Sequence, residues 1–223
     1  MSIDLQQMQL AYRAKLATLS VCTTGSTSLG ATGTTFTRAG GSFLTDGFYV
    51  GMEVKGTGFG ALNNAAANVV DVAALTLTVN RTLVTEVASA GRTLSVGLPS
   101  KVAYENDDFA DDDLEPGEPF FEEEFLPGPT MQLTAGDGGT IKAEPTLILS
   151  ISVPKGTGVG ASNGYRKALL SLFAPKVVMT LTNGDFLRVR TDPGPWAEQL
   201  LQLRPGWATT PVNIPLRLYT INS

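Results

Sequence analysis

Hydrophobic and polar residues alternate with different periods in three successive parts of the chain. From Ser2 to Leu19, apolar side chains recur every three or four residues, which is the spacing of an amphipathic helix. These side chains are Leu5, Met8, Tyr12, Leu16 and Leu19. Ser2 is a favourable N-cap residue, and Lys15 lies near the C-terminal end, where the helix dipole favours a cation. This pattern predicts a helix over Ser2–Leu19.

Residues 21–99 show no helical period and are rich in Gly, Thr, Ala, Val and Asn. Short runs with strand character are separated by glycine and asparagine turns. The expected strands are Thr34–Arg38, Val50–Thr57, Asn68–Val72, Leu75–Asn80 and Thr93–Gly97. Five short strands with glycine corners predict a small closed or nearly closed β-barrel.

Residues 100–223 combine strand-like runs with one helical run. Apolar spacing from Ser162 to Phe173 predicts a helix, which Pro175 ends. The expected strands are Val102–Asn106, Pro119–Leu126, Met131–Leu133, Ile141–Val153, Val177–Leu181, Phe186–Arg190 and Pro211–Ile221. Two helices against a mostly antiparallel sheet, together with the small barrel, predict an α+β fold that carries an inserted all-β domain.

Residues 102–129 hold eleven of the 21 acidic residues, and no lysine or arginine lies between Lys101 and Lys142. Aromatic residues are interspersed with the carboxylates, unlike in a disordered acidic tail. We therefore expect a strand, an acidic loop and a returning strand, arranged as a hairpin. In the returning strand, Phe121, Glu123 and Phe125 fall on one face and the intervening residues on the other.

This part of the chain resembles the tail-terminator (neck) proteins of long-tailed bacteriophages. The resemblance lies in the Tyr-Glu-Asn strand at 104–106, the Pro-Phe-Phe strand at 119–121 and Phe125-Leu126-Pro127. It continues in the strand 147–154 with its Pro-x-Gly-x-Gly turn, the helix at 165–173, Trp207 and the strand 211–216. The resemblance covers residues 1–20 and 100–223.

The resemblance implies two domains. Residues 1–20 and 100–223 would form a tail-terminator-like α+β domain, and residues 21–99 a β-barrel-like insertion, which is similar to a small module of phage tail proteins. The family forms rings of six copies that cap the tail tube, end its polymerisation and join the tail to the head connector. The implied partners are further copies of the chain, the tail-tube protein and a head-completion or connector protein. The implied location is the tail or neck of a virion that is assembled in the host cytoplasm.

DNA would pass through such a ring without specific binding. A lumen lined by carboxylates repels phosphates and creates no deep binding well. We expect the acidic residues to face this channel or the adjoining ring; they are Asp107, Asp108, Asp111, Asp112, Asp113, Glu115, Glu122, Glu123 and Glu124. A head-to-tail ring also needs a second, different patch on each subunit. The candidates are the basic residues Arg166, Lys167, Arg188, Arg190 and Arg204.

Composition and motifs exclude several classes of function. The net charge is −5, which argues against sequence-specific DNA binding. The chain has one cysteine and no histidine, so an internal disulfide and a Cys/His zinc site are excluded. The acidic loop lacks the EF-hand order, and the glycine loop at 156–160 lacks the P-loop lysine. We expect no enzyme activity, no cofactor, no metal and no membrane partner.

Other functions remain open, both among phage assembly proteins and in other classes of protein. A head–tail connector or stopper and a tail-tube subunit share the same composition, although a tube subunit would be almost entirely β. A carbohydrate- or calcium-binding module built on residues 21–99 is a different class. A hydrolase that uses the carboxylates of residues 105–124 is a third.

Overall fold

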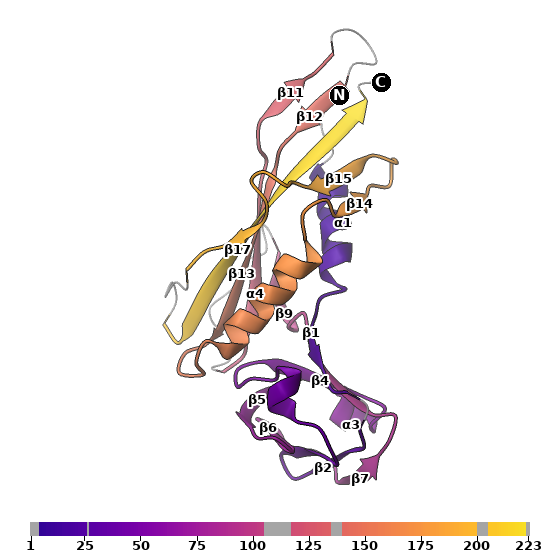
Figure 1. Cartoon of the computed structure of the whole chain (residues 1–223), viewed down its shortest axis with the longest axis vertical. Coiled ribbons are helices and arrows are strands. Elements are labelled where there is room, and N and C mark those ends of the chain that lie inside the picture. Colours follow the sequence, from indigo (N-terminus) through magenta and orange to yellow (C-terminus); the bar gives the residue numbers. More distant parts are fainter. Residues whose placement is uncertain (1–4, 26, 105–116, 135–139, 200–204, 222–223) are drawn as a thin grey trace.

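The protein is mostly β, so the predicted α+β class is wrong. The computed structural model describes residues 5–25, 27–104, 117–134, 140–199 and 205–221. Of these residues, 44% lie in strands and 17% in helices. Two sheets, of eight and nine strands, account for most of the described chain. Figure 1 shows them as two units joined end to end, with the smaller unit below.

The smaller unit is an eight-stranded sheet that curls into a half-barrel. Its strand order is β1-β8-β4-β5-β6-β3-β2-β7, so β1 and β7 are the free edges. The strands are β1 (Ser20–Thr23), β2 (Leu29–Thr32), β3 (Thr35–Arg38), β4 (Glu53–Thr57), β5 (Ala67–Val72), β6 (Thr76–Val79), β7 (Glu86–Ser89) and β8 (Thr93–Gly97). Two helical turns, α2 (Phe43–Asp46) and α3 (Ala61–Asn64), accompany them. The five expected strands correspond to β3, β4, β5, β6 and β8, whereas β1, β2 and β7 were not predicted.

The larger unit is built on a nine-stranded sheet. Its strands are β9 (Lys101–Ala103), β10 (Phe120–Leu126), β11 (Thr130–Gln132), β12 (Thr140–Ala143), β13 (Thr146–Pro154), β14 (Val178–Thr180), β15 (Phe186–Val189), β16 (Trp196–Ala197) and β17 (Trp207–Ile221). β17 pairs with β12 and β13 in one unbroken antiparallel register, from Thr140 opposite Ile221 to Pro154 opposite Trp207. β12 and β13 therefore lie end to end along one long strand.

Both long helices pack on the same face of this sheet. Tyr12 of α1 (Leu5–Leu16) stacks on Phe125 with ring centroids 5.6 Å apart. Tyr165 of α4 (Gly160–Leu172) meets Phe121 edge-on at 5.8 Å. Phe121 and Phe125 are buried on one side of β10, as the alternation predicted. The α+β prediction fails because the two long helices cover one face of one sheet only, while the other described residues, apart from the short α2 and α3, are strand, turn and loop.

The acidic hairpin expected between β9 and β10 is also wrong. β9 pairs with β10 in parallel, with Lys101 opposite Phe120 and Ala103 opposite Glu122. A parallel pair needs a crossover of a dozen or more residues. The sixteen residues from Tyr104 to Pro119 satisfy that requirement, so the length of the acidic segment permits either arrangement.

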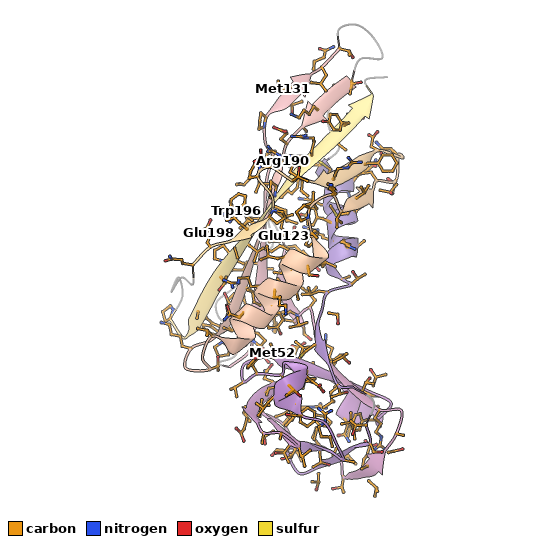
Figure 2. The ribbon with its side chains drawn as sticks, viewed as in Figure 1. Met52, Glu123, Met131, Arg190, Trp196 and Glu198 are labelled. Atoms are coloured by element: carbon orange, nitrogen blue, oxygen red, sulfur yellow. The ribbon has the colours of Figure 1, made fainter. Side chains whose placement is uncertain are left out.

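One end of the larger sheet extends beyond the helices (Figure 1). We call this end the arm; it consists of β11, β12 and the C-terminal part of β17, residues 216–221. We call the sheet face opposite α1 and α4 the open face. In Figure 2, Met131 marks the arm, well above Glu123 and Met52.

Gly128 sets the turn that carries the chain from β10 into the arm. A Cβ added to Gly128 would overlap the carbonyl oxygen of Glu144, which is backbone and has little room to move. We expect Gly128→Ala to lower the free energy of unfolding by about 1–3 kcal/mol, because the two backbones must separate. Chemical denaturation measures this change. Gly40→Ala is the control, since its Cβ meets nothing within 4 Å; an equal loss in both variants would contradict the prediction.

Candidate functional site

Strand register brings a row of large side chains together on the open face of the arm. Met131 lies opposite Lys142, Lys142 opposite Tyr219, and Tyr219 opposite Phe186. Directly opposed residues project from the same face of a sheet. On the other face, the next row is buried toward the helices; it consists of Ala143, Met179, Leu187 and Leu218.

The apolar members of this row remain accessible to solvent. Met131 is 52% exposed, Tyr219 46% and Phe186 55%. Two further apolar side chains at the same end are similarly exposed, Leu133 and Val178. Adjacent exposed apolar side chains of this size mark interaction surfaces more often than isolated ones. Tyr, Phe and Met are also enriched at protein interfaces.

A cluster of charges lies beside this row and includes Lys142 from it. The Glu144 carboxylate forms ion pairs with Lys142 at 2.7 Å, with Arg217 at 2.7 Å and with Arg190 at 3.9 Å. Arg188 faces Arg217 in the strand register. Four cations against one carboxylate leave a net charge of +3, and we call these five residues the cationic cluster. The hydrogen bonds from Lys142 and Arg217 lower the pKa of Glu144 to about 2.

The acidic segment, residues 105–116, rejoins the described chain at a point far from this cluster. The described residues begin again at Gly117, after this segment. The Trp207 indole N–H donates to the carbonyl of the next residue, Glu118, at 2.9 Å. Arg217 lies ten residues after Trp207 along β17, about 33 Å away at roughly 3.3 Å per residue. The expected acidic residues of the loop lie outside the described residues; they are Asp107, Asp108, Asp111, Asp112, Asp113 and Glu115.

The three glutamates of β10 occupy different environments. Glu123 is buried; it accepts from the Tyr12 hydroxyl at 2.7 Å and pairs with Arg13 at 2.6 Å. Its carboxylate is therefore engaged inside the subunit and is not presented to a channel or neighbour in this conformation. On the open face, Glu122 is half-buried and Glu124 is exposed.

The expected basic residues do not form one patch. Arg188 and Arg190 belong to the cationic cluster, whereas Arg166 and Lys167 are exposed on α4. Arg204 lies outside the described residues. Sequence reasoning did not single out Lys142 and Glu144, because their proximity to Arg217 depends on strand register. Alternation along residues 140–144 would have placed Lys142 and Glu144 on one face.

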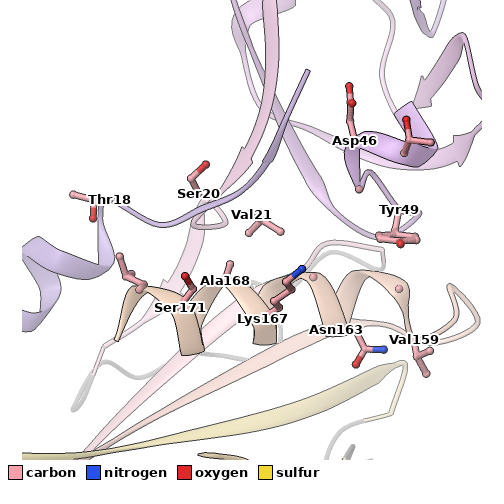
Figure 3. Close-up of a pocket in the computed structure, with 15 residues that line it drawn as sticks. Thr18, Ser20, Val21, Asp46, Tyr49, Val159, Asn163, Lys167, Ala168 and Ser171 are labelled. Carbon is pink, nitrogen blue, oxygen red and sulfur yellow. The ribbon is translucent and has the colours of Figure 1, made fainter. Parts of the chain in front are cut away.

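A groove of about 800 Å³ separates α4 from the half-barrel (Figure 3). Tyr49 stands over Gly160, while Lys167 and several hydroxyl groups line the opening. Asp46, also on its wall, is paired with Arg38 at 2.7 Å. Within the described part of the chain, no three His, Cys, Asp or Glu side chains gather as a metal site. Burial raises the pKa of the nearby Cys22 thiol to about 12, so it stays protonated at neutral pH.

Comparisons with known proteins do not identify the chain. No protein-family model matches it, and no curated protein matches it. A solved structure of a protein without a functional name matches with a TM-score of 0.41 and 22% identity, covering 55% of this chain and 79% of the other. A likeness at that level carries no argument. In the described residues, no helix is both long and apolar enough to span a membrane.

Neighbouring glutamates of β10 provide a test of the buried ion pair. Glu123→Ala leaves Arg13 and Tyr12 without their acceptor, and we expect a loss of roughly 3 kcal/mol in the free energy of unfolding. Glu124→Ala changes an exposed side chain and should stay within about 0.5 kcal/mol of the wild type. Urea denaturation of both variants measures the difference. Equal losses of unfolding free energy in the two variants would show that the ion pair between Glu123 and Arg13 does not stabilise the fold.

The low pKa of Glu144 predicts a pH dependence with a definite sign. Because the folded pKa of about 2 lies below the ordinary value of 4.5, the ionised cluster stabilises the fold above pH 4.5. This contribution is lost as the pH falls from 4.5 toward 2. The stability difference between the wild type and Glu144→Gln should therefore be largest near pH 7 and shrink toward pH 2. A difference that is independent of pH, in denaturant titrations, would contradict this assignment.

Proposed function

We propose that this chain is a structural subunit that assembles with further copies, head to tail, into a closed ring. The tail-terminator proteins that its sequence resembles act in this way, capping a tail tube and joining it to the head. By the same resemblance, six copies form the ring, and a tail-tube protein and a head-side connector bind its two faces. Enzymatic activity forms no part of the proposal.

The observation that carries the proposal is that two unlike sets of charged residues belong to different parts of one subunit. The arm presents exposed Met131 and Tyr219, next to exposed Phe186 of β15, beside a cationic cluster of net charge +3. The C-terminal end of the acidic segment is anchored through Glu118, beside Trp207, about 33 Å away along β17. A heterologous interface joins two different surfaces, and it gives a ring where its rotation closes. Opposite charges on those surfaces favour that contact over the pairing of like patches.

The acidic surface also suits passage of DNA. Carboxylates that are left facing the channel would repel the phosphate backbone and keep the polymer from binding. Glu124 is exposed on the open face, at the same strand that follows the acidic segment. Glu123 is excluded from this surface by its internal ion pair.

A tail-tube subunit is a second candidate. A tube subunit is expected to be almost entirely β, so the mostly-β fold favours this candidate more strongly than the predicted α+β fold did. Strands outweigh helices by 44% to 17% of the described residues. The two candidates differ in the product of assembly. A terminator ring stops at a fixed mass, whereas a tube subunit adds copies without limit as its concentration rises.

Native mass measurement over a concentration series tests the proposal. We expect the wild type to convert from a monomer to one oligomer of fixed mass. Arg188→Glu places a carboxylate in the cationic cluster and should raise the concentration needed for assembly by about tenfold or more. Arg166→Glu is the matched control, because it reverses an exposed cation on α4 and should leave assembly unchanged.

The same assay tests the contribution of the acidic segment to assembly. A triple variant, Asp111→Asn with Asp112→Asn and Asp113→Asn, should weaken assembly and reduce its dependence on salt. A wild type that remains monomeric at every concentration, or that grows into polymers without limit, would contradict the ring. If neither Arg188→Glu nor the triple Asp→Asn variant changes the concentration needed for assembly, the proposed pairing of the cationic cluster with the acidic segment is refuted.

A further inference from the structure

The arm ends in an edge strand whose outer side has no partner in the described chain. β11 pairs with β12 on one side and is the terminal strand of the sheet order. All three of its residues are exposed, and so are Leu133 and Thr134, which follow them. Such a strand presents a row of backbone N–H and C=O groups that can accept another strand.

The hydrogen-bond pattern shows which backbone groups point outward. The Leu133 N–H donates to the Thr140 carbonyl at 2.8 Å, and the Glu144 N–H donates to the Pro129 carbonyl at 3.2 Å. In an antiparallel pair, successive residues direct these groups alternately toward and away from the partner. Residues 129, 131 and 133 therefore bond to β12. Thr130 and Gln132 turn their N–H and C=O groups away from the sheet.

Within the described residues, this edge lacks the protection that the edge strands β7 and β9 carry. Proteins commonly block an edge strand with charged side chains, proline or a covering segment. From Thr130 to Thr134 the sequence is Thr-Met-Gln-Leu-Thr, with no charge and no proline. By contrast, Arg92 covers the edge strand β7 by donating to the Val87 carbonyl at 2.6 Å, and β9 begins with Lys101.

We propose that β11 is a strand-addition site at which an extended segment of a second copy of this chain pairs with Thr130 and Gln132. The inference rests on the proposed function, since it names the backbone contact through which neighbouring subunits meet. Backbone bonds would supply the register, and the side chains of the open face would supply specificity.

The surroundings of β11 indicate that the added strand comes from a second copy. Met131 lies in register with Lys142, a member of the cationic cluster. An incoming segment must therefore cover apolar side chains and bring negative charge. Residues 105–116 of the chain itself, outside β9 and β10, combine seven carboxylates with Phe109 and Leu114 and contain no lysine or arginine. A second copy thus supplies both requirements.

Gln132→Pro tests the inference because it deletes an outward N–H and leaves the bonds from residues 131 and 133 to β12 in place. We expect the concentration required for assembly to rise at least tenfold, with an unchanged circular dichroism spectrum and melting temperature. Gln132→Ala is the matched control; it keeps the N–H and should assemble like the wild type. Thr130→Pro, which deletes the other outward donor, should repeat the effect and serves if Gln132→Pro misfolds.

The outcomes separate this inference from the proposed function. A ring of normal mass and normal midpoint concentration in both proline variants would overturn strand addition while leaving the ring intact. Equal losses in Gln132→Ala and Gln132→Pro would also overturn it, because the side chain and not the backbone would then make the contact. A wild type that never assembles would contradict the ring and the strand addition together.

Discussion

The register of β17 against residues 140–154 holds the larger unit together and decides what each part of it can do. The pairing continues from Trp207 to Ile221, although Glu144 and Pro145 interrupt the opposite strand. Near Trp207 the sheet carries α4 on one face and the anchor of the acidic segment on the other. Toward Ile221 the same strands leave the helices behind and become the arm (Figure 1). One continuous strand thus connects a buried core to an exposed end.

The distribution of charge follows from this geometry. Glu123 lies on the helix-covered face, where desolvation would be costly without the ion pair with Arg13 and the Tyr12 hydroxyl. Burial and the hydrogen bond to Glu123 raise the pKa of Tyr12, so its proton stays available to the carboxylate. The Arg13 guanidinium also lies 4.3 Å from the Tyr104 ring centroid. This group ties α1 to the residues on both sides of the acidic segment, which fixes where that segment leaves the core.

The sequence predicted those features that depend on local periodicity. Helices α1 and α4 occur where apolar spacing placed them, and Phe121, Glu123 and Phe125 share one face of β10 as expected, although the burial of Glu123 was not predicted. Features that depend on long-range pairing were missed. The parallel pairing of β9 with β10 and the meeting of Lys142, Glu144 and Arg217 are set by register between distant segments. Strands β1, β2 and β7 do not alternate between buried and exposed residues, unlike the equally short β3 and β6, so they show no period of two.

The most direct test of the central claim, that copies meet at the arm, is hydrogen exchange followed by mass spectrometry on dilute and on assembled protein. Peptides that cover Thr130–Thr134 report on the outward amides of the arm, and peptides from β13 serve as an internal reference. The account predicts that exchange in the arm slows at least tenfold on assembly, while exchange in β13, already slow, changes little. Arm amides that exchange equally fast in monomer and assembly would contradict it.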